Sequence, residues 1–313
     1  MDRQGLVFCS SGTEAVNLAL LGAGRRLGPD RSLVTWTAEH QAVLGAARQL
    51  QLEGKRVEML PVDGACLPDP AAIPDHASLV SISFANNEVG TLQPVSELAA
   101  RAREVGALVH IDCCQGPRWM APPLGLADLA SFSGHKLGAA GGGLLYVRSE
   151  VRLEPLVYGG PQEWGRRGGH VDVGQAMAVA AALQVCTAER EARAAAARPL
   201  ADRLRDALLE AGARLIGDEP RLPNYACGTF AGRRGEDLLL ALDLAGVAAS
   251  SGSACAAGSL DPSHVLLAMG LSLEEAMGSL RLTVGYETTA SGVDRALAAL
   301  GGLPAPTLRG LDG

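Results

Sequence analysis

The chain has 313 residues, of which 48% are hydrophobic, 19% are charged and only 4% are aromatic. This composition is typical of an α/β protein that is long enough for one large and one smaller domain. The net charge of −7 argues against a nucleic-acid surface, and no apolar run approaches the roughly 20 residues that span a bilayer. We therefore expect a cytoplasmic protein with neither nucleic-acid nor membrane partners.

Short apolar strands alternate with helices through the first part of the chain. Strands are expected at 6–9, 32–36, 57–60, 79–84, 107–111, 126–130 and 144–147. Helices are expected to begin at 10–14, to run from His40 to Leu50, and to span 94–105. This alternation predicts a large, doubly wound and mostly parallel sheet.

The second part of the chain has a different organisation. A glycine-rich stretch at 158–174 precedes a long helix rich in Ala, Glu and Arg, expected at 175–211. After it we expect strands at 215–216, 227–230 and 279–283, and helices at 236–245, 262–269 and 291–300. The sequence thus predicts a large domain over 1–192 and a smaller C-terminal α/β domain over 193–313.

Polar side chains follow several of the expected strands, where functional residues of doubly wound sheets gather. They are Thr13, His40, Asn87, Asp112 with Gln115, and His135 with Lys136. The helix start at 10–14 also offers free N–H groups and a hydroxyl to an anion such as phosphate. An ordinary helix cap explains that start equally well.

Lys136 lies between two apolar strands and is flanked by Ser133 and His135. Burial disfavours the charged form of a lysine, and a neutral amine can form a Schiff base. The alternative is an ammonium group in water, and Asp112 alone could be a turn residue or a cap. Together, a lysine, a carboxylate after a buried strand and an anion-binding helix start meet the needs of pyridoxal 5'-phosphate (PLP).

Two residues of the second part also carry chemical interest. Cys255 lies in a run of small residues at 250–259, where a thiol can be mobile and exposed, although an idle loop cysteine is the alternative. Arg281 interrupts a strand-like run, and a buried arginine needs an anion, either a substrate or a structural partner. The chain's seven cysteines are scattered without a CxxC pair, which argues against a zinc site or a disulfide framework.

The ordered motifs of the chain resemble those of the cysteine desulfurases of the NifS/IscS type, in class V of the PLP-dependent aminotransferase-fold enzymes. The matching segments are 11–14, Glu39-His40, 86–90, Asp112 with Gln115, 131–136, 159–163 with Arg167, 250–255 and 281–285. The resemblance implies PLP fold type I, like that of aspartate aminotransferase. It implies a large, mostly parallel sheet domain and a smaller C-terminal domain that carries the cysteine loop.

The resemblance also implies a role for each matching residue. Lys136 would be the Schiff-base lysine, Asp112 would pair with the pyridine nitrogen, and His40 would lie over the ring as a catalytic residue. The remaining cofactor-binding residues implied are Asn87 and Gln115 at the ring hydroxyl, Gly12, Thr13, Ser133 and His135 at the phosphate, and His170.

In the same reading, Cys255 attacks the sulfur of substrate L-cysteine, becomes a persulfide and leaves alanine, while Arg281 and Asn87 bind the substrate. The resemblance implies a homodimer that passes sulfur to an acceptor or scaffold protein, for iron–sulfur cluster assembly or tRNA thiolation. The alternatives are selenocysteine lyase or another class V lyase or aminotransferase, and a non-catalytic paralogue that lacks its N-terminus and acts as a binding partner.

The chain departs from the family pattern in four places. The family begins some tens of residues earlier, with a segment like LDNAATT. Members have threonine in place of His170, where it reaches the phosphate of the neighbouring subunit. The stretch after Lys136 lacks the usual Gly-Pro-Lys-Gly, and Tyr286 replaces an arginine. We expect the fold and the cofactor to survive these changes.

Overall fold

The structure is a computed structural model, and it describes residues 5–217, 219–251 and 261–303. The chain forms two compact units. The first contains 1–62, 67–86 and 93–190, and the second contains 63–66, 87–92 and 191–313. Two short segments of the first half of the sequence therefore belong to the second unit. The domain boundary expected after residue 192 stays a prediction.

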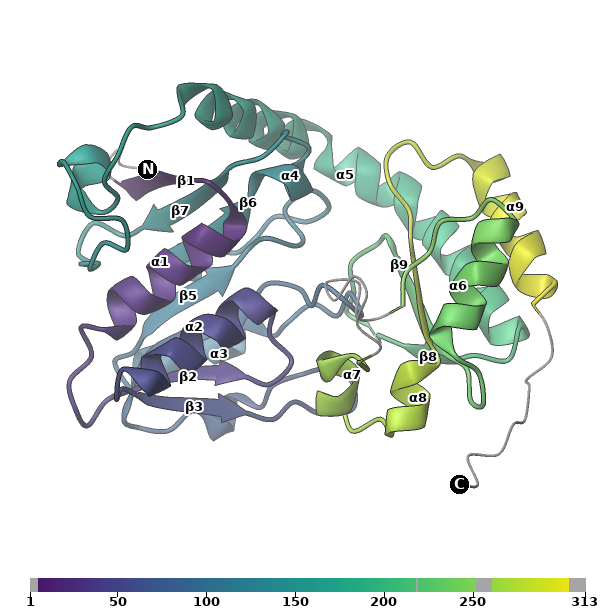
Figure 1. The fold of residues 1–313 in the computed structure, drawn as a ribbon, viewed down its shortest axis with the longest axis horizontal. Coiled ribbons are helices and arrows are strands. Elements are labelled where there is room, and N and C mark those ends of the chain that lie inside the picture. Colours follow the sequence, from purple (N-terminus) through teal and green to yellow (C-terminus); the bar gives the residue numbers. More distant parts are fainter. Residues whose placement is uncertain (1–4, 218, 252–260, 304–313) are drawn as a thin grey trace. The chain divides into compact units, whose positions relative to one another are not determined.

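A seven-stranded sheet forms the centre of the first unit (Figure 1). Its strands are β1 (Leu6–Cys9), β2 (Ser32–Trp36), β3 (Arg56–Leu60), β4 (Ala77–Ser83), β5 (Leu108–Asp112), β6 (Leu129–Ser133) and β7 (Gly143–Val147). Their order is β1-β7-β6-β5-β4-β2-β3, and all run in one direction except β7, which is antiparallel to both its neighbours. The predicted doubly wound and mostly parallel sheet is thus confirmed.

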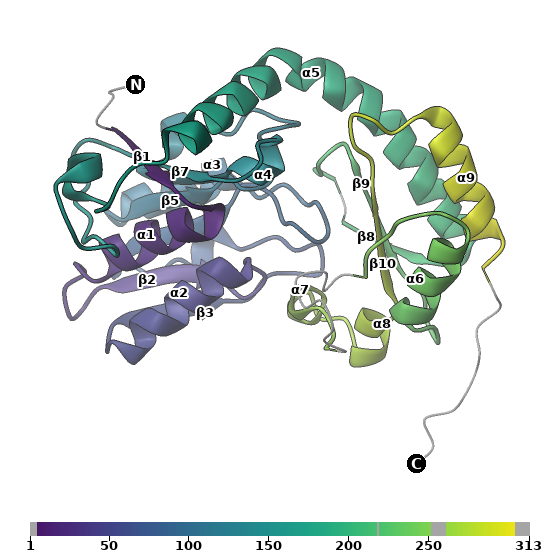
Figure 2. The ribbon, with the colours of Figure 1, turned by 45° about the horizontal axis from the view of Figure 1, so that its top comes forward.

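Helices cover both faces of this sheet. The helices of the first unit are α1 (Gly12–Gly24), α2 (Gln41–Leu52), α3 (Val95–Glu104) and α4 (Gly134–Leu137), with 3-10 turns η2 (Pro70–Ala72), η3 (Leu124–Leu126) and η4 (Gln162–Gly165). Helices α1 and α2 pack side by side, and α3 lies on the opposite face against β4 and β5 (Figure 2). Leu18, Leu33, Val43 and Leu145 are all buried in the core that joins α1 and α2 to the sheet. Each such side chain contributes about 1.5–3 kcal/mol through burial.

One strand differs from its expected position. The sequence predicts a strand at 126–130 because that run is apolar, but β6 begins at Leu129 and extends through Ser133. The prediction is wrong at both ends because backbone pairing, not side-chain polarity, sets the strand. Ser131 pairs with Leu145 and Ser133 with Gly143 of β7, so the serines lie inside the sheet. Lys136 consequently follows the strand by only three residues, in the short helix α4.

The long helix α5 (Val173–Glu210) runs from the first unit into the second. The second unit has a three-stranded antiparallel sheet in the order β10-β9-β8. Its strands are β8 (Arg214–Ile216), β9 (Tyr225–Thr229) and β10 (Ser279–Thr283), and its other helices are α6 (Gly235–Leu244), α7 (His264–Ala268), α8 (Leu273–Met277) and α9 (Ala290–Gly301). Helices α6 and α9 pack together beside this sheet (Figures 1 and 2).

Two further searches cover the described residues. Among them, no helix combines the length and the apolar character needed to cross a membrane. In the same part of the chain, no group of three or more His, Cys, Asp and Glu side chains could hold a metal ion.

Candidate active site

The first turn of α1 lies directly against the end of β6. A Cβ atom placed on Gly12 would lie 2.8 Å from Cβ of Ser133 and 2.7 Å from Sγ of Cys114, so only glycine fits without a shift. Ser11 caps the helix by accepting a hydrogen bond from the N–H of Glu14. The N–H groups of Gly12 and Thr13 have no acceptor within the helix, and they carry its positive end. This corner can therefore bind an anion.

Lys136 and His135 lie in α4, which begins at the end of β6. Oγ of the buried Ser133 is 2.9 Å from Nδ1 of His135. Burial lowers the pKa of His135, and the charge of Lys136 lowers it further, so His135 tends toward its neutral form. Lys136 is half-buried, and its amine makes no hydrogen bond or ion pair with any residue that the structure describes. An unengaged amine in this position is available for covalent chemistry.

Asp112 is the last residue of β5 and is 5% exposed. Its Oδ1 accepts a hydrogen bond from the backbone N–H of Cys114 at 2.9 Å. Burial and the charge of Asp112 raise the pKa of the Cys114 thiol, whereas the charge of Lys136 lowers it. Asp112 ends β5 and Lys136 follows β6, and these two strands are parallel neighbours, so both residues lie at the same edge of the sheet. Gln115 follows this turn and is half-buried.

His40 occupies the N-cap position of α2, and its Nδ1 accepts a hydrogen bond from the N–H of Ala42 at 3.1 Å. In a neutral ring with this bond, the proton is on Nε2. Next to it, Glu39 is 4% exposed and accepts a hydrogen bond from the N–H of Ser83 at 2.9 Å. Burial raises the pKa of Glu39 to about 8, and the charge of Asp112 also raises it. Glu39 is therefore mostly protonated at neutral pH.

Glu39 is a residue of this region to which the sequence assigned no function. Its signal is an acidic residue between a fully buried strand and a helix start, in the motif Glu39-His40. His110 is a second such residue. It is polar and lies inside the apolar strand β5, where it is fully buried.

His170 belongs to the loop before α5 and is exposed. The loop is held to the start of α1 by Arg167, whose Nε donates to Oε1 of Glu14 at 3.0 Å. Among the described residues, the hydrogen bonding of His170 is limited to its carbonyl, which accepts from Nη1 of Arg167. The structure therefore does not join the His170 ring to the groups at the strand ends.

Arg281 and Asn87 meet in the second unit. Nη1 of Arg281 donates to the carbonyl of Asn87 at 3.0 Å, and Nη2 donates to Oγ of Ser250 at 3.2 Å. The backbones of Ser250 and Arg281 also exchange two hydrogen bonds. Arg281 thus holds Ser250, which stands two residues before the segment 252–260. Cys255 lies in that segment, outside the described residues.

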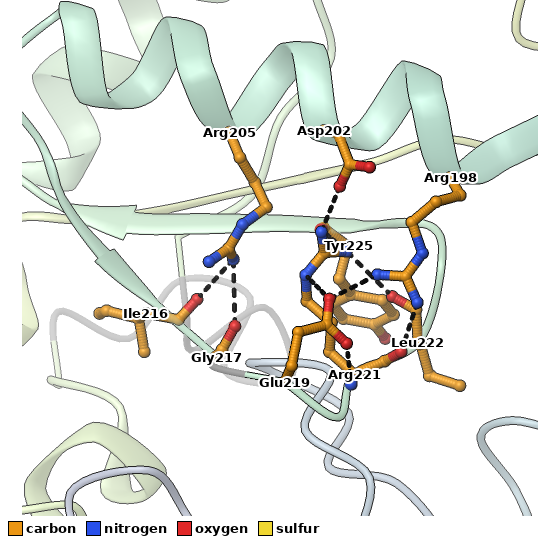
Figure 3. Close-up of polar contacts among 9 residues, drawn as sticks. All are labelled: Arg198, Asp202, Arg205, Ile216, Gly217, Glu219, Arg221, Leu222 and Tyr225. Atoms are coloured by element: carbon orange, nitrogen blue, oxygen red, sulfur yellow. Dashed lines mark hydrogen bonds and ion pairs between the residues drawn. The ribbon is translucent and has the colours of Figure 1, made fainter.

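A buried arginine supports this arrangement (Figure 3). Arg221 is 4% exposed, forms ion pairs with Asp202 and Glu219, and donates from Nη1 to the carbonyl of Tyr225 at 3.3 Å. The hydroxyl of Tyr225 in turn donates to the carbonyl of Asn87 at 3.1 Å. The carbonyl of Asn87 therefore accepts hydrogen bonds from two side chains, which fixes its position in this unit.

Most of the sequence-predicted residues lie in the first unit, whereas Asn87 and Arg281 lie in the second. Six residues of the first unit lie at the carboxyl ends of β1, β5 and β6, at one edge of the sheet: Gly12, Thr13, Asp112, Ser133, His135 and Lys136. At the same edge, Gln115 follows β5 and His40 follows β2. The free N–H groups suit a phosphate, the carboxylate suits a protonated ring nitrogen, and the unengaged amine suits an aldehyde. These residues fit PLP. A fold-type I sheet with such a donor set defines a PLP-dependent enzyme.

Comparison with known proteins gives the family. Residues 1–296 match the family model described as "Aminotransferase class-V". The chain therefore belongs to the class-V aminotransferase family, whose members use PLP, and this confirms the cofactor and the fold class expected from the sequence.

Relatives of high similarity carry a more specific name. The chain is 41% identical over 311 residues to a cysteine desulfurase of Gluconacetobacter diazotrophicus, covering 95% of this chain and 77% of the relative. It is 40% identical over 306 residues to the cysteine desulfurase IscS of Methanosarcina thermophila, covering 93% and 75%. A solved NifS-like protein superposes with a TM-score of 0.87 at 30% identity, covering 96% of this chain and 82% of that one. The resemblance to cysteine desulfurases is thus confirmed.

Proposed function

We propose that this protein is a PLP-dependent cysteine desulfurase that converts L-cysteine to L-alanine and keeps the sulfur as a persulfide on Cys255. The observation that carries the proposal is that Asp112 and Lys136 follow the neighbouring parallel strands β5 and β6, where the helix start at Gly12 packs against Ser133 and Cys114. The similarity to proteins named cysteine desulfurase adds the substrate and the reaction.

Each residue of the first unit has a distinct task in this proposal. The N–H groups of Gly12 and Thr13 hold the phosphate together with Ser133 and His135. Lys136 holds the cofactor covalently, and Asp112 keeps its ring nitrogen protonated. When bound to these residues, PLP would supply an electron sink that labilises the bonds of the substrate.

Three more residues complete the cofactor site in this proposal. His40 would move a proton through Nε2, since its Nδ1 accepts from the N–H of Ala42. The family resemblance would assign Gln115 and Asn87 to the ring hydroxyl.

Arg281 binds the substrate carboxylate, for which its planar fork is suited. The Cys255 thiolate attacks the substrate sulfur. A bond forms between the two sulfurs, the Cβ–S bond of the substrate breaks, and its electron pair stays on carbon and is protonated to give alanine. The persulfide then passes to an acceptor or scaffold protein for iron–sulfur cluster assembly or tRNA thiolation. A cytoplasmic location stays a prediction.

Several large apolar side chains of the first unit are exposed. Tyr158, Trp164, Val173 and Met177 are 71%, 62%, 59% and 68% exposed. Trp164 has a left-handed backbone, with φ of 60°. Large exposed apolar side chains gathered along one stretch mark interaction sites. We propose that these residues form a homodimer contact and that His170, in the same stretch, reaches the partner's phosphate.

The reaction is tested by measuring alanine and sulfide release from L-cysteine with PLP and a reductant. We expect turnover in the wild type and in Cys186→Ser, a buried control thiol, and loss of turnover in Cys255→Ala. Alanine release that continues unchanged in Cys255→Ala would contradict the persulfide step and favour selenocysteine lyase or another lyase. A protein that binds PLP but never turns over would favour a non-catalytic paralogue.

The cofactor attachment has a built-in control, because the chain's lysines are Lys55 and Lys136. Lys55 donates to the carbonyl of Leu27, away from the site. After borohydride reduction of the PLP-loaded protein and proteolysis, we expect the label on the peptide of Lys136. A label on Lys55 alone would contradict the assignment. For the dimer, sedimentation velocity should show dissociation in Trp164→Ser and none in Leu244→Ser, a control leucine that is 81% exposed in the second unit.

A further inference from the structure

A chain of buried polar side chains crosses three neighbouring strands and ends on Asp112. Ser81 of β4 lies opposite His110 of β5, and Oγ of Ser81 is 2.9 Å from Nδ1 of His110. On the other side, Nε2 of His110 is 3.0 Å from Oγ of Ser131 in β6. Oγ of Ser131 is 3.4 Å from Oδ1 of Asp112, the residue opposite it. Ser81, His110 and Ser131 are all fully buried.

Hydrogen-bond accounting gives this chain one direction. An ionised carboxylate only accepts, so Ser131 donates its proton to Asp112. Ser131 then accepts from Nε2–H of His110, and Nδ1 of His110 accepts from the hydroxyl of Ser81. This needs a neutral imidazole with one donor and one acceptor, and burial lowers the pKa of His110 to about 4. Each donor therefore supports the next, from Ser81 to the carboxylate.

The two oxygens of Asp112 are consequently unequal. Oδ1 accepts from Ser131 and also from the backbone N–H of Cys114 at 2.9 Å. The thiol of Cys114 also hydrogen-bonds the Asp112 carboxylate. The two donors on Oδ1 restrict the rotation of the carboxylate.

We propose that Ser81, His110 and Ser131 are positioning residues, which hold Oδ1 of Asp112 so that Oδ2 meets the protonated ring nitrogen of PLP. This inference rests on the role proposed for Asp112. It extends that role to His110 on the strand of Asp112 and to one serine on each of the two neighbouring strands. Without Ser81, Nδ1 of His110 lacks its donor, and the ring can take the other tautomer. Ser131 would then donate to the ring, and Asp112 would lose a hydrogen bond.

The hydrogen bond between Thr35 and Ser81 supplies a matched control. Thr35 of β2 is fully buried, and its hydroxyl donates to the carbonyl of Ser81 at 3.2 Å. It is not part of the series of hydrogen bonds from Ser81 through His110 and Ser131 to Asp112, which we call the relay. We compare Ser81→Ala, Ser131→Ala and Thr35→Val with the wild type. Urea unfolding establishes that each variant is folded. The dissociation constant of PLP, the pH dependence of the visible absorbance of the bound cofactor, and the separate kcat and KM values are then measured.

We expect Ser131→Ala to bind PLP about tenfold more weakly, with a shifted pH dependence of the absorbance and a fall in kcat at nearly constant KM. Ser81→Ala should change the same quantities in the same direction by less, and Thr35→Val should match the wild type. The inference is overturned if folded Ser81→Ala and Ser131→Ala bind PLP and absorb as the wild type does. Equal losses in Thr35→Val would also overturn it, since they would reflect packing alone.

A cofactor-free readout separates this inference from the proposed function. Long-range ¹H–¹⁵N NMR of the wild-type chain should show His110 with its proton on Nε2, and Ser81→Ala should lose this preference. A proton on Nδ1 in the wild type overturns the relay even if the enzyme is active. A wild-type chain that binds no PLP overturns the proposed function and this inference together.

Discussion

Nη1 of Arg281 donates a hydrogen bond to the carbonyl of Asn87, 194 residues earlier in the chain, at 3.0 Å. The same guanidinium reaches Ser250, just before the segment that carries Cys255. Arg281, which we propose binds the substrate, thus contacts both Asn87 and Ser250 within the second unit. A conservative change at Arg281 should therefore raise KM for L-cysteine while the protein stays folded.

Arg281→Lys should raise KM for L-cysteine about tenfold, because an ammonium keeps the charge but loses the bidentate fork. Because the residues proposed to hold the phosphate, the aldehyde and the ring nitrogen of PLP all lie in the first unit, we expect the PLP affinity to change much less than KM. Steady-state alanine release measures KM and kcat. Arg214→Lys is the control, since Arg214 is 61% exposed in an ion pair with Glu275, and it should leave KM unchanged. An unchanged KM in Arg281→Lys would remove this residue from the substrate site.

Gly12→Ala should weaken PLP binding about tenfold, because the added Cβ meets Ser133 and Cys114 at less than 3 Å and displaces the first turn of α1. The measurement is a PLP titration of the apoprotein. Gly45 of α2 is the matched control, since its added Cβ would have no neighbour within 4 Å. Gly45→Ala should keep the PLP affinity and stabilise the fold by about 0.5–1 kcal/mol. Equal affinity in both variants would contradict a phosphate site at this helix start.

The stability of the protein should depend on the protonation of Glu39 between pH 5 and 8. Burial raises its pKa from 4.5 to about 8 in the folded chain. In this window the folded chain keeps a proton that the unfolded chain loses, so stability falls as pH rises. Glu39→Gln removes that slope. Its free energy of unfolding should therefore rise relative to that of the wild type, by about 1–4 kcal/mol, as the pH increases from 5 to 8.

Urea unfolding at several pH values measures this difference. Glu53→Gln serves as a control, because the Arg25 hydrogen bond lowers the pKa of Glu53 to about 2. Its contribution is complete above pH 5 and should add no slope in this window. If Glu39→Gln and the wild type have parallel pH profiles, Glu39 is ionised in the folded chain.

Arg221→Met should destabilise the second unit by about 2–4 kcal/mol, because the carbonyls of Leu222 and Tyr225 lose a buried donor. The free energy of unfolding is measured with urea and followed by circular dichroism. Arg203→Met is the control, since Arg203 is 42% exposed in its ion pair with Asp294 and should cost less than about 1 kcal/mol. Equal losses would show that the Arg221 network adds no stability beyond that of a surface pair.

Much of the first unit is predictable from local sequence. The alternation of apolar strands and helices predicts the parallel sheet, and strand-following polar residues such as Asp112 and Lys136 mark its functional edge. These signals survive because strand and helix periodicity, turn residues and the placement of polar groups after strands are all local properties. The roles that we propose for Cys255 and Arg281 come from the family motifs and not from a local pattern.

Other features depend on the pairing of strands that are far apart in sequence. Whether 131–133 lies in a strand depended on β7, and the relay from Ser81 through His110 to Ser131 depends on the register of β4, β5 and β6. The raised pKa of Glu39 likewise comes from burial beside Asp112, 73 positions away in the chain. Sequence alone predicts which residues could do chemistry. Tertiary structure decides which of them share a buried, low-dielectric environment, because desolvation and hydrogen-bond partners are set by non-local packing.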